Sequence, residues 1–140
     1  MGKVAVVYWS GTGNTKIMAN EVAAGVKAAG GEVSVYDAVD FSVDLLDTYS
    51  GVAFGCPSMG AEILEEDEFQ PMWDKVENKL AGKKVALFGS YDWGDGEWMR
   101  NWEETCKSNG ITLACDFVIC QLEPGDDTKS ACQELGKALV

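Results

Sequence analysis

The apolar residues of the chain gather in five short runs that are separated by longer, mixed stretches. Most of the runs are continuous rather than alternating, which is typical of strands covered by other elements on both faces. The pattern therefore predicts five buried strands. They cover residues 4–9, 33–36, 52–55, 85–89 and 113–120.

The stretches between the runs carry apolar residues at helical spacing. In residues 14–29, Val22 and Val26 lie near one face, and the Gly30-Gly31 pair that follows is a typical helix stop. Residues 40–49 fit either a short helix or a loop. Three further helices are predicted, over residues 69–80, 98–108 and 128–139.

Strands and helices alternate along the chain without a linker or an internal repeat. This order predicts a single α/β domain over residues 1–140 with a doubly wound, five-stranded parallel sheet. Such sheets bind ligands beyond the carboxyl ends of the strands, where the strand order reverses. We therefore expect the chemistry in the loops after the first, third and fourth strands.

Composition and charge exclude several classes of function. The chain has 11 Lys and Arg against 23 Asp and Glu, a formal net charge of −12, so nucleic-acid backbones and anionic membranes would repel it. It contains no histidine, which excludes a Ser-His-Asp triad and any metal site that needs histidine. The apolar fraction of 46% is too high for a disordered chain.

The five cysteines are odd in number, and no two have Cys-x-x-Cys spacing. This pattern argues against a disulfide framework, an iron–sulfur site or a zinc ribbon, so we expect small buried side chains and no bound metal. The apolar segment after Lys3 is shorter than a signal peptide needs, and no segment approaches the ~18 apolar residues of a membrane span. We expect a soluble, cytoplasmic protein.

The loop after the first predicted strand has the composition of a phosphate cradle. Its glycines let the backbone approach a ligand, its hydroxyls and amide supply hydrogen bonds, and the next helix offers free N–H groups and its positive dipole end. The loop holds no Lys or Arg before Lys16, so neutral donors would hold the anion. The structural alternative is a glycine-rich turn with a helix cap. The cradle residues are Ser10, Gly11, Thr12, Gly13, Asn14 and Thr15.

Three common motifs do not fit these loops. The dinucleotide fingerprint needs a glycine at Lys16, and the spacing of a Walker A loop is absent. A phosphatase Cys-x5-Arg motif that starts at Cys56 would need an arginine at Glu62.

The loops after the third and fourth predicted strands each carry one large, polarisable side chain among small residues. These side chains are Met59 and Trp93, which could grip a flat ring by stacking on either side of it. The alternative is that both are ordinary core residues. For Trp93, the neighbouring Gly94, Asp95 and Gly96 indicate an exposed loop instead.

The loop of residues 10–15 after an apolar strand resembles the phosphate-binding loop of flavodoxins, which are FMN-carrying electron-transfer proteins. The later loops extend the resemblance over the whole chain, whose length is similar to that of short-chain, clostridial-type flavodoxins. The resemblance implies a flavodoxin-like sheet with strand order 2-1-3-4-5 and non-covalently bound FMN. It also implies a low-potential one-electron carrier, not an enzyme, that cycles mainly between the neutral semiquinone and the anionic hydroquinone.

The resemblance further implies roles for individual residues. Met59 would lie against the inner face of the isoalloxazine ring and Trp93 against its outer face. Glu62 would meet the pyrimidine N3–H, and main-chain N–H groups near Asp92 would meet the N1 and O2 edge. The cofactor site would comprise Ser10, Gly11, Thr12, Gly13, Asn14, Thr15, Pro57, Ser58, Met59, Gly60, Ala61, Glu62, Ser90, Tyr91, Asp92, Trp93 and Gly94.

Three positions of this chain depart from the pattern of close relatives. Asp92 stands where glycine is usual, and Ala61 stands where an acidic residue is usual. Pro57 replaces a residue that can often donate an N–H group to the ribityl chain.

Acidic residues lie near the ends of several predicted strands, in residues 65–68, 92–97 and 123–127. A charge run is most often a solvated face, but here three runs fall at one end of the sheet, around the proposed ring. We expect the excess charge to steer a basic-faced redox protein and to oppose negative charge on the flavin. We also expect a monomer.

Two other classes of function stay open on the sequence. A small FMN enzyme, such as a quinone reductase, is disfavoured by the lack of histidine, of a second nucleotide motif and of spare chain for a substrate pocket. A non-flavin module, such as a receiver domain, needs acidic residues where Tyr8 and Trp9 stand and a phosphorylatable aspartate at the end of the third strand.

Overall fold

The computed structural model describes residues 2–11, 13–59 and 63–140. The strands are β1 Lys3–Tyr8, β2 Glu32–Asp37, β3 Gly51–Gly55, β4 Lys84–Tyr91 and β5 Val118–Gln121. The helices are α1 Asn14–Ala28, α2 Phe69–Val76, α3 Glu97–Ser108 and α4 Asp126–Ala138.

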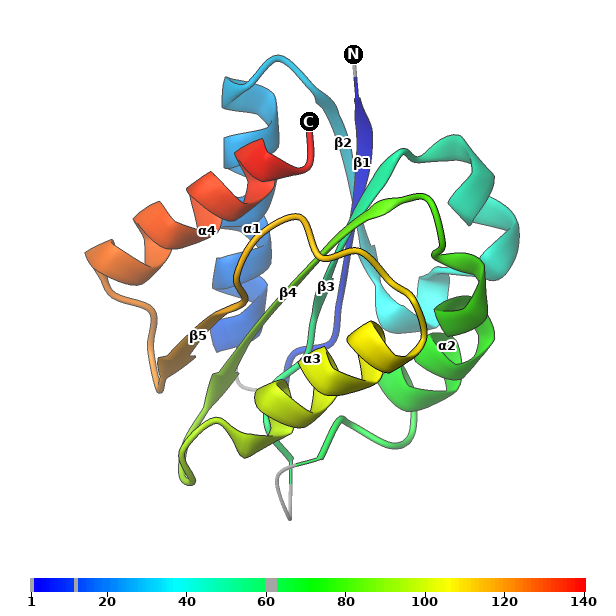
Figure 1. Ribbon diagram of the computed structural model, residues 1–140. Coiled ribbons are helices and arrows are strands. Elements are labelled where there is room, and N and C mark those ends of the chain that lie inside the picture. Colours follow the sequence, from blue (N-terminus) through cyan, green and yellow to red (C-terminus); the bar gives the residue numbers. More distant parts are fainter. Residues whose placement is uncertain (1, 12, 60–62) are drawn as a thin grey trace.

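These elements form three layers, in which a parallel sheet lies between two layers of helices (Figure 1). Helices α1 and α4 cover one face of the sheet, and α2 and α3 cover the other. The strand order is β2-β1-β3-β4-β5. After β1, strand β2 lies on one side of it and β3 to β5 follow on the other side, so the strand order reverses between β1 and β3. The predicted doubly wound sheet with order 2-1-3-4-5 is therefore confirmed.

Alternate residues of the central strands explain the continuous apolar runs. In β1, Val4 and Val6 pack in the layer of α1 and α4, whereas Ala5 and Val7 pack in the layer of α2 and α3. All four side chains are fully buried. Each fully buried valine stabilises the fold by about 1.5–3 kcal/mol, whereas a polar group buried there without a hydrogen-bond partner would cost free energy, so the runs are mainly apolar.

Two segments differ from the sequence prediction, and the structure decides a third that the sequence left open. Helix α2 ends at Val76 and continues as a 3₁₀ turn over Glu77–Lys79. The ambiguous segment before β3 forms two 3₁₀ turns, Ala38–Asp40 and Val43–Thr48. The predicted fifth strand was too long, because the chain bends at residues 114–115 and only Val118–Gln121 pairs with β4 as a strand.

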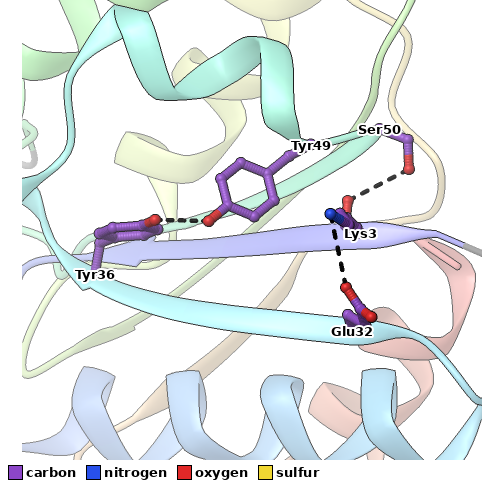
Figure 2. Close-up of polar contacts among 5 residues, drawn as sticks. All are labelled: Lys3, Glu32, Tyr36, Tyr49 and Ser50. Carbon is purple, nitrogen blue, oxygen red and sulfur yellow. Dashed lines mark hydrogen bonds and ion pairs between the residues drawn. The ribbon is translucent and has the colours of Figure 1, made fainter.

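Polar contacts of the edge strand β2 and of its neighbour β1 add to the ladder between these two strands (Figure 2). Tyr36 points towards Tyr49, and their hydroxyl oxygens are 2.6 Å apart. At the other end of the strand, the Lys3 Nζ and a Glu32 carboxylate oxygen are 3.9 Å apart, and the Ser50 hydroxyl donates to the Lys3 carbonyl at 3.3 Å. The hydrogen bond with Tyr49 is the main cause that raises the pKa of Tyr36.

No helix within the described ranges is long and apolar enough to cross a membrane. The helices have the length and the one-sided burial of surface helices that cover a sheet.

Candidate cofactor site

The loops after β1, β3 and β4 meet at the carboxyl end of the sheet and enclose a pocket of about 220 Å³. All three loops that the sequence singled out contribute to its wall. The lining residues are Trp9, Gly11, Pro57, Ser58, Met59, Ser90, Tyr91 and Asp92. A second hollow, of about 250 Å³, is lined by residues of both α2 and α3, but it receives no side chain from the β1 or β4 loops among the residues described. The convergence of three strand ends favours the first pocket as the functional site.

The loop after β1 is folded around the hydroxyl of Ser10. The Ser10 Oγ accepts hydrogen bonds from the N–H groups of Gly13, at 3.0 Å, and Lys16, at 3.3 Å. Gly13 has a φ of 99°, a left-handed conformation that glycine adopts without strain. The loop thus brings a side-chain oxygen to the N-terminus of α1, where a phosphate oxygen would also be favoured. Thr12 lies outside the described residues.

Thr15 and Ser90 are brought together from positions 75 residues apart. Their side-chain oxygens are 2.8 Å from one another, and both residues are buried, with 1% and 4% exposure. Each hydroxyl has one hydrogen to donate, so the pair uses one hydrogen internally and keeps one for a ligand. The contact joins the first turn of α1 to the end of β4, between two of the three loops of the pocket.

Backbone hydrogen bonds hold the loop after β3, which forms one wall of the pocket, to β4 and to the segment that follows the loop. The Ser58 N–H group donates to the Ser90 carbonyl at 3.0 Å, which continues the pairing of β3 with β4 beyond the strand. Met59 and Ile63 exchange two backbone hydrogen bonds, at 2.9 and 3.0 Å. Met59 is half-buried rather than part of the core. Gly60, Ala61 and Glu62, which the sequence also assigned to the site, lie outside the described residues.

The loop after β4 is exposed, as its glycines indicated. Trp93 is 59% exposed, and its neighbours Asp92 and Gly94 are exposed as well. The Asp92 carbonyl accepts a hydrogen bond from the Gln121 side chain at 3.2 Å, which ties this loop to β5. Asp92 lines the pocket, whereas Trp93 and Gly94 lie outside its lining in the part of the chain that the structure describes.

Trp9 is a pocket residue that the sequence analysis missed, because it assigned this residue to the first strand. Strand β1 ends at Tyr8, and Trp9 begins the loop with its indole N–H group donating to Glu68 at 2.8 Å. A Cβ atom on Gly11 would lie 3.1 Å from the Trp9 ring, so the absence of a side chain at Gly11 leaves room for that ring. The sequence signal that could have indicated this role is a large aromatic residue at the carboxyl end of a central strand.

One residue of the predicted acidic surface, Glu65, is buried. Glu65 is buried, with 6% exposure, and its carboxylate accepts backbone N–H groups at the start of α2. A carboxylate at a helix N-terminus is favoured by the unpaired N–H groups there, so Glu65 belongs to the fold and not to the solvated face. Asp95 is exposed but paired with Arg100 at 2.9 Å. The exposed acids near the site include Glu66, Asp67, Glu68, Asp92, Glu123, Asp126 and Asp127.

The cysteines do not form a reactive or metal-binding group. All five lie in the described ranges and are free, three of them buried and two half-buried. Burial is the main cause that raises the pKa of each thiol, to about 12 for Cys106 and Cys132. Thiols with such pKa values are protonated and unreactive at neutral pH. Among the described residues, no three His, Cys, Asp or Glu side chains are grouped to hold a metal ion.

The fold and the pocket together define a doubly wound α/β protein with a ligand site at the reversal of its strand order. A model of the flavodoxin family matches residues 6–135. The chain is 44% identical over 135 residues to a flavodoxin of Clostridium beijerinckii, with 96% of this chain and 97% of the relative covered. It is also 44% identical over 135 residues to a flavodoxin of Megasphaera elsdenii, with 96% of both chains covered. The chain therefore belongs to the flavodoxin family of FMN-binding electron carriers.

The solved structures support the same assignment. The solution structure of two-electron reduced flavodoxin from Megasphaera elsdenii has a TM-score of 0.89, with 97% of each chain covered and 44% sequence identity. A flavodoxin from the domain Archaea has a TM-score of 0.85 at 27% identity. The protein is thus an electron-transfer protein that works with redox partners, and its cofactor is FMN.

The described residues fit both the phosphate and the ring of FMN. The start of α1 directs the N–H groups of Gly13 and Lys16 towards one oxygen atom, the Ser10 Oγ, and the positive end of the helix suits a phosphate beside it. Trp9, Met59 and Tyr91 give the pocket the broad, polarisable surfaces that suit a flat ring. When bound, FMN supplies the one-electron chemistry, and the protein supplies its orientation and electrostatic environment.

Proposed function

We propose that this flavodoxin is a low-potential one-electron carrier that holds FMN non-covalently in the pocket between the β1, β3 and β4 loops. In this proposal it cycles mainly between the neutral semiquinone and the anionic hydroquinone. The observation that carries the proposal is the convergence of the three loops on one pocket beside the N-terminus of α1.

The phosphate would be held by the loop of residues 10–15 without a basic side chain. Support comes from the N–H groups of Gly13 and Lys16, which already converge on an oxygen atom, that of Ser10. The Thr15–Ser90 pair would supply a further hydroxyl hydrogen from the buried side of the loop. Lys16 itself is exposed, so its charge would contribute less than these short, oriented contacts.

The ring would be held by the loops of residues 57–62 and 90–94. Met59, half-buried and tied to Ile63, would present its thioether to one face. The exposed indole of Trp93 would stack on the other face, a role that the exposure of this large apolar side chain supports.

The low potential would follow from negative charge near the ring. Asp92 lines the pocket, and further exposed acids lie in the segments that surround it. A carboxylate near the ring makes it harder to add an electron that leaves negative charge there. The same surface would attract redox proteins with a basic face.

We further propose that the protein acts as a monomer in the cytoplasm. The net charge of −12 supports the monomer, because copies with so large a like charge repel one another. The free, protonated cysteines support a reducing compartment.

A redox titration followed by absorbance tests the proposed cycle. The protein is loaded with FMN and reduced stepwise under argon. We expect two separate one-electron steps with a blue intermediate at neutral pH, and negligible oxidation of NAD(P)H by the protein alone. A single two-electron step, or turnover of NAD(P)H with a quinone, would contradict the proposal and favour a small flavin enzyme.

A further inference from the structure

The start of α2 is held by a buried carboxylate whose oxygens are both engaged. The Glu65 Oε2 accepts the N–H group of Asp67 at 2.9 Å, and Oε1 accepts those of Glu68 and Phe69 at 2.7 and 2.8 Å. The Glu65 carbonyl accepts the N–H group of Gln70 at 2.8 Å. The three carboxylate bonds are charge-assisted, and together with the carbonyl bond they fix Glu65 to the first turn of α2.

The same residue also contacts the beginning of the loop that follows β3. The Glu65 N–H group donates to the Cys56 Sγ, with 3.3 Å between nitrogen and sulfur. Cys56 is fully buried, its N–H group donates to the Phe88 carbonyl at 3.2 Å, and its carbonyl accepts the indole N–H group of Trp98 at 3.1 Å. Cys56 is therefore a fixed point of the fold, bonded to β4 and α3.

The Cys56–Glu65 contact closes the base of the loop that forms one wall of the pocket. Pro57, Ser58 and Met59 follow Cys56 directly and line the pocket. The chain returns through Ile63, which is bonded to Met59, and reaches Glu65 two residues later. The wall is thus bonded to β4 on one side, through the Ser58 N–H group, and on its other side it is connected to the start of α2 through Glu65.

We propose that Glu65 is a positioning residue for the cofactor: its buried carboxylate and the Cys56 thiol together fix the wall of Pro57, Ser58 and Met59. This inference rests on the proposed function, in which that wall contacts FMN. If it holds, changes at Glu65 alter both the affinity for FMN and the relative affinity for its oxidation states. A carboxylate that only caps α2 would alter stability and leave the potentials unchanged.

The test compares Glu65→Gln and Glu65→Ala with Glu66→Gln. Glu65→Gln removes the charge and leaves one side-chain carbonyl oxygen as acceptor, whereas Glu65→Ala removes both side-chain acceptors. Glu66 is the exposed neighbour in the same acidic run, so Glu66→Gln gives the same change in net charge without touching the cap. The measurements are the FMN dissociation constant, both midpoint potentials at low and high salt, and the thermal unfolding of the protein with and without FMN.

We expect Glu65→Ala to raise the FMN dissociation constant at least tenfold, and Glu65→Gln to raise it less. Both variants should change the ratio of affinities for two successive oxidation states by threefold or more, at high salt as well as low. Glu66→Gln should stay within twofold of the parent at high salt. The inference would be overturned if Glu65→Gln had the same midpoint potentials as Glu66→Gln but a lower unfolding temperature. Glu65 would then be a helix cap only.

The variant Cys56→Ala tests the same inference while keeping the Glu65 carboxylate. It removes the acceptor of the Glu65 N–H group and the thiol that donates to the Pro57 carbonyl at 3.5 Å, and both contacts lie at the base of the wall. It should therefore shift the potentials in the same direction as Glu65→Gln. Parent-like potentials in a folded Cys56→Ala variant would also overturn the inference. If the parent protein itself fails to bind FMN, the proposed function fails instead, so the two failures are distinguishable.

Discussion

Thr15 and Ser90 show how a single contact can serve both the fold and the site. Their buried hydroxyls bond to one another across the junction of α1 and β4, and the pair borders the proposed phosphate site. Removing one hydroxyl leaves the other without its partner in a buried position, which costs about 1–3 kcal/mol. The effects on folding and on binding are therefore coupled at these positions.

We predict that Thr15→Val weakens FMN binding more than Lys16→Ala does. Valine keeps the shape of threonine but supplies no hydroxyl, so we expect roughly a tenfold higher dissociation constant, equivalent to about 1.4 kcal/mol. Lys16→Ala leaves the backbone N–H group that Ser10 accepts, so its effect should be smaller. Fluorescence titration of the FMN-free variants measures both constants, and a larger defect in Lys16→Ala would refute the idea that neutral donors dominate.

Leu122 has an unusual backbone conformation for a branched apolar residue. Its φ is 61°, it is 54% exposed, and its N–H group donates to the Tyr91 carbonyl at 2.8 Å. A left-handed conformation costs a residue with a side chain about 1–2 kcal/mol, and little burial offsets this cost here.

We predict that Leu122→Asn stabilises the protein by about 1 kcal/mol, because asparagine tolerates the left-handed region. Leu122→Ala is the matched control: it removes the exposed apolar side chain but keeps a Cβ atom and hence the strain. Urea unfolding at neutral pH measures both variants. An equal gain in Leu122→Ala would mean that exposure, and not backbone strain, is the source of the cost.

At the scale of elements, α1 and α4 pack against one another at the closest distance that their backbones allow. A Cβ atom on Gly136 would lie 2.1 Å from the Val22 carbonyl oxygen, and one on Gly25 would lie 2.0 Å from the Gln133 carbonyl oxygen. The contact therefore depends on two glycines, one on each helix. It positions α1, whose N-terminus supplies the proposed phosphate site.

We predict that Gly136→Ala destabilises the protein by about 1–3 kcal/mol, because the helices must move apart to admit the methyl group. FMN binding should weaken as well if the shift reaches the start of α1. Ala24→Leu is the control, since Ala24 lies on the exposed side of α1 and leucine is also a good helix former. Thermal unfolding compares the two, and a neutral Gly136→Ala would show that the helix interface adapts without cost.

At the scale of the whole molecule, the charges are unevenly distributed between the two ends of the sheet. Each of the four α-helices in the described ranges carries a lysine in its last turn. The last turns of α1 and α4 lie beside the two chain termini, at the end of the sheet opposite to the carboxyl ends of the strands (Figure 1). Glu123, Asp126 and Asp127 are exposed at the pocket end, together with Asp92. A partner with a basic face would therefore be attracted to the pocket end.

We predict that Glu123→Gln combined with Asp127→Asn slows electron transfer to a small basic redox protein several-fold at low salt. The control pairs Glu32→Gln with Asp44→Asn, which makes the same change in charge away from the pocket loops and should alter the rate less than twofold. Both effects should shrink as the ionic strength approaches about 1 M, where charges more than about 3 Å apart are screened. Stopped-flow rates at several salt concentrations test this, and equal slowing by the two double variants would contradict a directed approach.

The sequence by itself predicted the layers of this protein and the three loops that line its candidate site. Continuous apolar runs predict strands buried on both faces, and helical spacing predicts the helices between them, because both signals depend on residues close together in the chain. The loop around Ser10 is also a local feature, since its glycines and hydroxyls act within six residues of one another.

Only the tertiary structure decided which individual side chains serve the site. Glu65 and Glu66 are identical neighbours in one acidic run, yet one is buried in a helix cap and the other is exposed. Thr15 meets Ser90, and Trp9 meets Glu68, across separations of 75 and 59 residues. Such contacts depend on how the layers pack, and a local pattern of polarity carries no information about the partner that a side chain meets.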